Sequence, residues 1–364
     1  MQLSGNPRPE SFLFINPTTT HTRGTTMKST TRRNLGVIAA ATAILALAAC
    51  SGGDGGGSTP KAAAPSEIDP FSPEQENIVV AGYPQNAFAS VPAAMQNGIA
   101  AEYGIGVELQ PAENAPAMLA QVISGAIPIG AVNGFFSVPA SIEGADVRII
   151  GEILRGTKGT QTVEVLDDSI KSPKDLEGKR VGVVGLLSGH QARIETAVNA
   201  DGGDSSKVEF VNLPWAEMVP NLQNDQVDAI SVTSVFQDAA RDLGTRSVID
   251  LAIEPGLWPE FPDAQWLANG AWVDANPNTV AAFQCAVVIK GAELANGDQN
   301  AYEEALRFFD YTDEGIANDI HPNLPADNDP EVVQIIPEMM HELGWIDEEF
   351  DVADITVPLP TNCD

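Results

Sequence analysis

From residue 77 onward, short runs rich in β-branched residues alternate with amphipathic stretches of helical period. This alternation restricts the possible folds more than any other feature of the chain. In its first part we expect strands over residues 77–82, 107–109, 127–131 and 147–150, with helices over 90–103, 116–124 and 135–144 between them. Such an order is typical of an α/β unit built on a mostly parallel sheet.

A second unit of the same kind follows, with strands expected over 161–166, 180–184, 208–212 and 227–232 and helices over 188–200, 216–224 and 235–243. Ser188 and Gln191 have the spacing of a capping box at a helix start. Residues 254–262 lack a period and are expected to form a loop. Two later helices are expected to open at Asn276-Pro277 and Asp329-Pro330, each with one apolar stripe that must pack on another element.

The N-terminal segment has the pattern of an export signal rather than of a folded element. Basic residues follow Met27, an uncharged apolar run covers 35–49, and Leu-Ala-Ala then leads to Cys50. The run is too short for a membrane-spanning helix but suits a signal peptide. The Leu-Ala-Ala-Cys sequence that ends at Cys50 resembles a bacterial lipobox. This resemblance implies a signal region over 1–49 (lipoprotein signal peptide 27–49) and lipidation at Cys50. An ordinary secretory signal with an incidental cysteine is the alternative, and the sequence leaves Sec or twin-arginine export open.

Residues 50–75 are rich in Gly, Ser, Pro and Ala and are expected to form a flexible tether. With residues 1–49 removed, 14 basic and 49 acidic side chains remain, a net charge of −35. A protein this acidic is a poor partner for nucleic acid, because phosphate binding needs a basic face. No segment after the signal region approaches membrane-spanning length. Together with the lipobox, this predicts an extracytoplasmic protein that is held at the outer face of the membrane only by its lipid.

With Cys50 lipidated, Cys285 and Cys363 would carry the thiols left after processing. In an oxidising compartment such a pair most simply forms one disulfide, which would tie the C-terminal tail to a helix. Two unpaired thiols are the alternative.

Motifs of catalysis and metal binding are absent from the sequence. It contains no H-E-x-x-H, C-x-x-C or G-x-S-x-G, and the glycines after the strand at 180–184 do not have dinucleotide-binding spacing. We therefore expect no enzymatic activity, no metal and no cofactor.

Several segments resemble the solute-binding proteins of ABC importers in the nitrate, aliphatic sulfonate, taurine and thiamine-precursor group. The most specific is IKSPKDLEGKRVGVVG, which is similar to the entry of that family's second lobe. GYPQNAFASVPAAMQNGIAAEYGIGVELQ, MLAQVISGAIPIGAVNGFFSVPASIEGADVRIIGEI, VPNLQNDQVDAISV and MMHELGWIDEEFDVADI extend the resemblance over about residues 77–355.

The resemblance implies an α/β, two-lobed periplasmic-binding-protein type II fold with a mostly parallel sheet in each lobe. Lobe I would comprise residues 76–157 and 254–364, and lobe II residues 158–253. A small-molecule ligand would lie in the cleft between the lobes. The protein, expected to be a monomer, would then deliver it to a membrane permease and ATPase complex.

Residues that follow the strands are the expected ligand contacts, because ligands of open α/β sheets bind at the carboxyl ends of the strands. The candidates are Gln85, Asn86, Phe88, Asn114, Asn133, Gly134, Phe135, Ser188, Gly189, His190, Trp215, Thr233 and Ser234. None of them is cationic, which disfavours an oxyanion ligand unless Arg155 or Lys158 reaches in. The sequence leaves sulfonate, nitrate, taurine, a pyrimidine or an aromatic acid as ligands. A ligand sensor for a signalling receptor, or an extracytoplasmic enzyme, is the alternative function.

Overall fold

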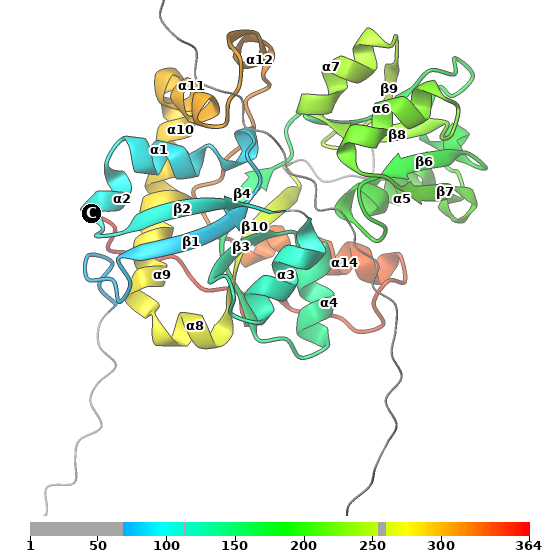
Figure 1. The fold of residues 1–364 in the computed structure, drawn as a ribbon. Helices are drawn as coiled ribbons and strands as arrows, with labels where there is room; N and C mark the ends of the chain where they lie inside the picture. Colours follow the sequence, from blue (N-terminus) through cyan, green and yellow to red (C-terminus); the bar gives the residue numbers. More distant parts are fainter. Residues whose placement is uncertain (1–67, 113, 254–259) are drawn as a thin grey trace, which may run out of the picture. The chain divides into compact units, whose positions relative to one another are not determined.

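Two five-stranded sheets organise the protein, whose computed structural model describes residues 68–112, 114–253 and 260–364 (Figure 1). The expected signal region, Cys50 and most of the tether lie outside these residues. The first sheet has the order β2-β1-β3-β10-β4. Its strands are β1 (Asn77–Gly82), β2 (Gly106–Pro111), β3 (Ile129–Val132), β4 (Val147–Arg155) and β10 (Pro262–Asn269).

The second sheet has the order β7-β6-β8-β5-β9. Its strands are β5 (Gln161–Val165), β6 (Arg180–Val183), β7 (Glu209–Asn212), β8 (Ala229–Thr233) and β9 (Arg246–Asp250). One strand in each sheet runs against the others: β10 is antiparallel to β3 and β4, and β5 is antiparallel to β8 and β9. The expected α/β architecture with mostly parallel sheets is thus confirmed.

The chain passes between the sheets twice. The antiparallel strand of each sheet, β5 or β10, is the first strand that the chain forms after it crosses from the other sheet. The first crossover runs from Arg155 to Gln161 and the second from Asp250 to Pro262. The two crossovers adjoin, because the amide of Gly156 donates to the carbonyl of Phe261 at 2.8 Å. Lobe boundaries at 157/158 and 253/254 stay a prediction.

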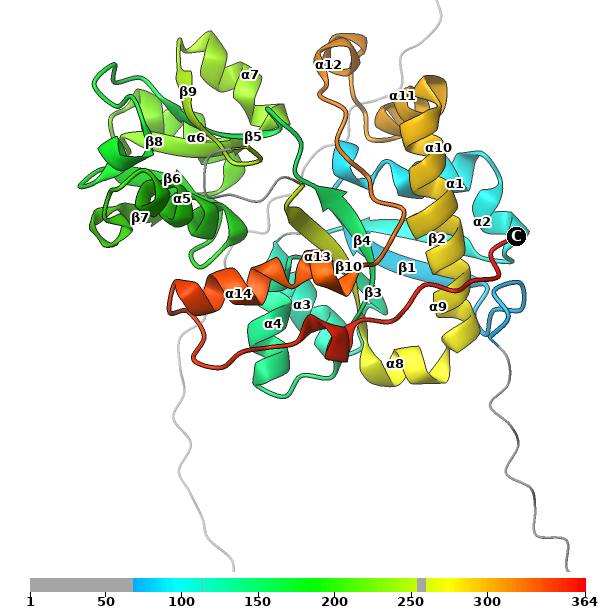
Figure 2. The ribbon, with the colours of Figure 1, turned by 180° about the vertical axis from the view of Figure 1, so that it is seen from behind.

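The helices of the first part pack on both faces of its sheet. α3 contacts β3 and β10, and α4 contacts β10, whereas the π-helical segment η4 packs on α1 and β4. In Figure 2, α9 and α10 belong to one long helical column that continues through η4. These helices are α1 (Ser90–Gln96), α2 (Ile99–Glu102), α3 (Ala115–Ile123), α4 (Gly134–Ile142), α8 (Gly270–Ala275), α9 (Pro277–Phe283), η4 (Gln284–Gly291), α10 (Ala292–Gly297), α11 (Gln299–Phe308), α12 (Asp313–Asn318), α13 (Pro330–Val333) and α14 (Ile335–Glu342).

The second sheet carries α5 (Gly189–Ala200), α6 (Trp215–Gln223) and α7 (Ser234–Asp242). The capping box expected at α5 is half right. The Ser188 hydroxyl accepts from the amide of Gln191 at 3.4 Å, but the Gln191 side chain accepts from the amide of Leu187, one residue earlier than a capping box requires.

Several local expectations were wrong. The helix expected over 90–103 breaks at Gly98, whose φ of 78° ends α1 and restarts the chain as α2. The last helix breaks at Gln334, between α13 and α14. The Asn276 side chain does not cap α9, because its amide group bonds to Trp272 and Gln75 instead. Strands β9 and β10 were not predicted.

The main core lies around the first sheet and its helices, with Trp266 of β10 fully buried near its centre. Close packing there depends on Gly151: a Cβ on β4 at this position would lie 2.5 Å from a methyl carbon of Val288 on η4. Ala192 of α5 belongs to the same buried cluster. The second sheet therefore supplies an element to the core of the first.

The disulfide expected between Cys285 and Cys363 is confirmed. It joins η4 to the C-terminal tail, with the two Cα atoms 5.4 Å apart and a sequence separation of 78. The Tyr103 hydroxyl donates to the Cys363 carbonyl, and Lys290 pairs with Asp364 at 3.3 Å. Several independent contacts thus hold the tail on the first part of the molecule.

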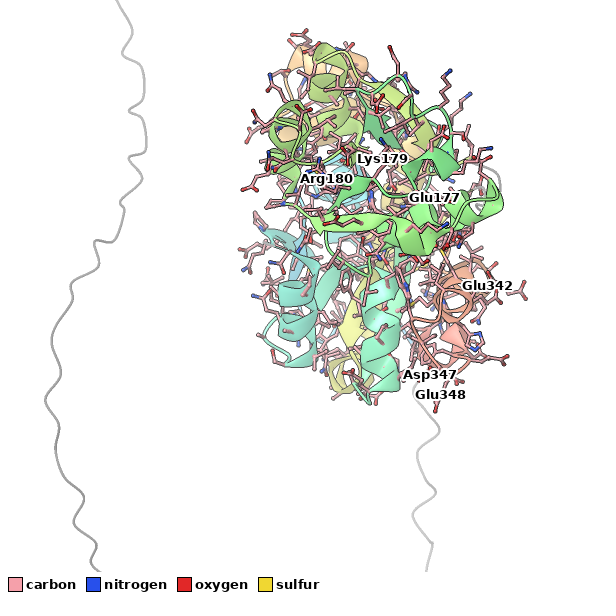
Figure 3. All side chains as sticks on the ribbon, turned by 90° about the vertical axis from the view of Figure 1, so that its right-hand side faces the viewer. Glu177, Lys179, Arg180, Glu342, Asp347 and Glu348 are labelled. Carbon is pink, nitrogen blue, oxygen red and sulfur yellow. A yellow bond between two sulfur atoms is a disulfide. The ribbon has the colours of Figure 1, made fainter. Side chains whose placement is uncertain are left out.

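Charge is distributed unevenly along the chain. No Lys or Arg follows Arg307, so exposed acidic residues such as Glu342, Asp347 and Glu348, labelled in Figure 3, have no basic neighbour in sequence. Among the described residues, no helix is both long enough and apolar enough to cross a membrane.

Candidate functional site

The residues that follow strands β6, β7 and β8 form an aromatic group on the second sheet. The indole of Trp215 stacks on Phe236 with ring centroids 5.5 Å apart and planes 6° apart. The imidazole of His190 meets Trp215 edge-on at 5.5 Å. All three rings are only half-buried. They offer aromatic surface of the kind that binds small organic molecules.

The orientation of His190 is fixed by the second sheet itself. Its Nδ1 lies 2.6 Å from the hydroxyl of Ser231, which is fully buried on β8. Burial, with a smaller contribution from the Arg193 charge, lowers the pKa of His190 to about 3. The imidazole is therefore neutral near pH 7. If the Ser231 hydroxyl donates to Nδ1, Nε2 carries the proton and is a hydrogen-bond donor.

A buried ion pair joins elements of the two sheets beside this group. Nη2 of Arg193 on α5 lies 2.7 Å from Oδ1 of Asp263 on β10, and the two side chains are 1% and 6% exposed. Arg193 Nε donates to the Gly189 carbonyl at 3.0 Å, and Nη2 also donates to Gln161. The guanidinium lies over the ring of Phe261, 4.7 Å from its centroid.

Burial shifts the pKa values of both partners of this ion pair. It raises the pKa of Asp263 and lowers the pKa of Arg193, and the charge of each partner opposes the shift of the other. Taking charges out of water is costly, so a pair of this kind persists only with close contacts and further hydrogen bonds.

Three predicted contacts, Asn133, Phe135 and Gly189, meet around the ion pair. The Asn133 side chain accepts from the amide of Phe135 at 2.8 Å and donates to the backbone carbonyl of Asp263 at 2.5 Å. A Cβ on Gly189 would lie 3.1 Å from the Phe135 ring. The strand ends of the two sheets are therefore in direct contact here.

Asn86 follows β1 but has its side chain occupied. Its amide nitrogen donates to Asp319 at 2.9 Å, and its backbone amide donates to the Tyr311 hydroxyl at 3.3 Å. The same Asp319 accepts from the Tyr302 hydroxyl at 2.5 Å. Asn86 thus anchors the loop after β1 to the segment that follows α12.

The remaining predicted contacts have mixed surroundings. Phe88 is 2% exposed in the core against Trp266, and Gly134 packs against Ile336. Asn114 is exposed and caps α3. Gln85 and Thr233 are half-buried, Ser188 caps α5, and α7 begins at Ser234, whose side chain lies outside the described part.

Arg193, Asp263, Phe261, Ser231 and Phe236 were not among the predicted contacts. For Arg193 a signal existed: it lies one helical turn after Gly189, so it projects on the same side of the helix. Ser231 was a polar residue between the apolar Ile230 and Val232. Asp263 and Phe261 gave no signal, because β10 itself was not predicted.

Comparison with known proteins identifies a matching family and relatives that are themselves solute-binding proteins. Residues 85–301 match the family model described as NMT1/THI5 like. The formylaminopyrimidine-binding protein of Halalkalibacterium halodurans is 24% identical over 226 residues, 60% of this chain and 66% of that protein. The taurine-binding periplasmic protein of Escherichia coli K12 is 23% identical over 229 residues, 63% of this chain and 70% of that protein.

The aligned region thus spans about two thirds of these two relatives. Among solved structures, the periplasmic aliphatic sulphonate binding protein SsuA of Escherichia coli has a TM-score of 0.62 at 17% identity, over 79% of this chain and 93% of that one. The two-sheet architecture is therefore that of periplasmic solute-binding proteins, and the chain belongs to the NMT1/THI5-like family.

Proposed function

We propose that this protein is the solute-binding component of an ABC importer, which binds a small organic solute between its two sheets and delivers it unchanged to a membrane permease. Its family and fold support this proposal. So do the binding proteins for formylaminopyrimidine and taurine among its relatives.

The contact between the strand ends of the two sheets carries the proposal. Gly189 and Arg193 from α5 lie against Phe135, Asn133 and Asp263 from the first part of the chain. Two adjoining crossovers connect the parts, so a rotation about them would separate these residues and admit a ligand. Binding free energy would then favour the state in which the residues meet.

The aromatic group supplies the apolar part of the proposed site. Trp215 and Phe236 present half-buried rings, and His190 adds a neutral polar edge next to them. Such a combination of aromatic surface with a few oriented polar groups is the usual composition of small-molecule sites. Of the predicted contacts, we keep Asn133, Gly189, His190 and Trp215 as ligand-binding residues, whereas Phe135 is packed into the core beside them.

Attachment to the membrane through a lipid on Cys50, with residues 50–75 as tether, remains part of the proposal. It would place the protein outside the cell beside its permease, as a monomer. Mass spectrometry of the protein from membranes tests it: a diacylated N-terminal cysteine is expected, and cleavage without a lipid would refute the anchor.

A ligand screen of the processed protein tests the function. Differential scanning fluorimetry would compare taurine, alkanesulfonates, nitrate, aminopyrimidines and aromatic acids. A ligand at 100 times its Kd adds about 2.7 kcal/mol to the free energy of unfolding, enough for a melting-point rise of several degrees. Isothermal titration must then show one site and recover the ligand unaltered. Conversion of a bound compound to product would overturn a transport role.

A further inference from the structure

The buried ion pair between α5 and β10 has hydrogen-bonding capacity that the protein does not use. Among the described residues, Nη1 of Arg193 and Oδ2 of Asp263 are buried polar atoms without a hydrogen-bond partner. A buried polar atom left unpaired costs about 1–3 kcal/mol. One unpaired donor and one unpaired acceptor therefore belong to the same ion pair.

The other polar atoms of the pair are already engaged, which makes the two free ones distinctive. Arg193 Nε bonds to Gly189, and Nη2 bonds to Gln161 and to Asp263 Oδ1. The Asn133 side chain bonds to the backbone carbonyl of Asp263 and holds that residue in place. Contacts inside the protein thus orient the pair and leave one atom of each partner free.

The surroundings of the pair place it within the proposed ligand site. Gly189 lies between Arg193 and Phe135, and Gly156 of the first crossover lies against Oδ2 of Asp263, where a Cβ would be 3.5 Å away. The guanidinium rests on the ring of Phe261 in the second crossover. Separation of the two sheets at the crossovers would open this contact.

Electrostatics limits the ligands that suit such a pair. The Asp263 carboxylate offsets the Arg193 charge, and His190 nearby is neutral. Arg155 is not free either, because it pairs with Glu152 and Asp327. A simple oxyanion carries only acceptors, so it would meet the Asp263 carboxylate as well as the guanidinium and be repelled by it.

We propose that Arg193 and Asp263 together select a solute that carries a hydrogen-bond acceptor beside a donor, such as an aminopyrimidine or an aminosulfonate zwitterion, and that they discriminate against simple oxyanions. The acceptor would bond to Arg193 Nη1 and the donor to Asp263 Oδ2. The proposal rests on the proposed function, since it names the ligand class of that same site.

Two matched pairs of probes test it by isothermal titration. Taurine is compared with ethanesulfonate, and 4-amino-2-methylpyrimidine with 2-methylpyrimidine, because the members of each pair differ only in the amino group. The wild-type protein is expected to bind the amino member of at least one pair at least about tenfold more tightly, since a carboxylate left unpaired on binding is costly.

The Asp263→Asn variant then tests whether the Asp263 carboxylate causes the preference for the amino compound. This variant keeps the shape of the side chain but removes its charge, so we expect the preference within the pair to fall to less than about threefold and ethanesulfonate or nitrate to bind more tightly. Asp228→Asn is the control, because Asp228 pairs with Arg180 at 3.1 Å on the second sheet (Figure 3 labels Arg180).

The wild-type comparison needs no variant, so an Asp263→Asn protein that does not fold leaves the test intact. Equal binding of both members of each pair, tighter binding of nitrate, or no binding of any of the four probes would overturn the inference. A different ligand found in the broader screen would in that case preserve the proposed function. Unchanged discrimination in a folded Asp263→Asn protein would remove Asp263 from the selection.

Discussion

The strand ends of the two sheets present their side chains differently. After the strands of the first sheet, Phe88 and Phe135 are each 2% exposed and pack into the core, and Asn86 is held by Asp319. After the strands of the second sheet, His190 and Trp215 are half-buried and lie edge to face, so part of their aromatic surface remains exposed. The first edge is thus fixed by packing, whereas the second has surface available for a ligand.

This difference suggests a division of roles between the two parts. Side chains already packed in a core contribute shape and rigidity, and their truncation lowers the free energy of unfolding. Half-buried aromatic side chains contribute less to the core than fully buried ones, so their truncation should lower ligand affinity more than stability. Substitutions at the two edges should therefore separate stability from binding.

The largest effect is expected for Phe88→Ala. Phe88 packs edge-on against Trp266 at 5.6 Å, and truncation of a buried Phe costs about 3–5 kcal/mol. In a protein of this size that corresponds to a fall of about 10 °C in melting point. Phe308→Ala is the matched control, because Phe308 is 44% exposed and should cost less than about 1 kcal/mol. Equal melting points of the two variants would contradict the comparison.

Trp215→Ala should show the opposite behaviour at the second sheet. We expect the affinity for the ligand found in the screen to fall at least about tenfold, with the melting point of the free protein changing by only a few degrees. Trp272→Ala is the control, since Trp272 is also half-buried but lies on α8. Unchanged affinity in Trp215→Ala would remove Trp215 from the site.

The sequence predicted those parts of the site that depend on local pattern. Asn133 and Ser188 follow strands and cap helices, and both are where local rules place them. The role of Arg193 depends on Asp263, 70 residues further along, in a strand that begins with a proline and was not predicted as a strand. The position of Arg193 one helical turn after Gly189 was a signal that it lies at the sheet edge, but its partner could not be read from its neighbours in sequence.

Asn86 illustrates the same limit from the other side. Its position after β1 predicts ligand contact, yet the partner of its side chain, Asp319, lies 233 residues away. Hydrogen bonds between such distant segments depend on how the helices return to the first sheet. A strand–helix pattern therefore locates the edge of a sheet but does not say which side chains at that edge stay free.

A pH-dependent effect on stability is expected from a carboxyl group buried at the first sheet. Glu152 on β4 pairs with Arg155 at 2.5 Å, and burial raises the pKa of Glu152 from 4.5 to about 7 against the effect of that pairing. The folded protein then binds more protons than the unfolded chain between those pH values. Its free energy of unfolding should therefore fall as pH rises through this window, by about 3 kcal/mol.

Glu152→Gln checks this assignment. The amide keeps the size of the side chain and does not ionise, and Arg155 retains Asp327 as its partner. Chemical denaturation at about pH 5 and about pH 8 should show a smaller loss of stability at the higher pH in the variant than in the wild type. The same loss in both proteins would place the titrating group elsewhere.

The smallest effect is expected for the pH dependence of binding at the second sheet. Because burial holds the pKa of His190 near 3, its imidazole stays neutral between about pH 5 and about pH 8. Affinity for an uncharged ligand such as an aminopyrimidine, once its own titration is taken into account, should then change less than about twofold over this range. A histidine with an ordinary pKa near 6.5 would instead become charged midway through it. A large loss of affinity below about pH 6.5 that disappears in His190→Gln would show that the imidazole does take up a proton. The edge of the second sheet would then be less shielded from water than the contacts of His190 with Ser231 and Trp215 imply.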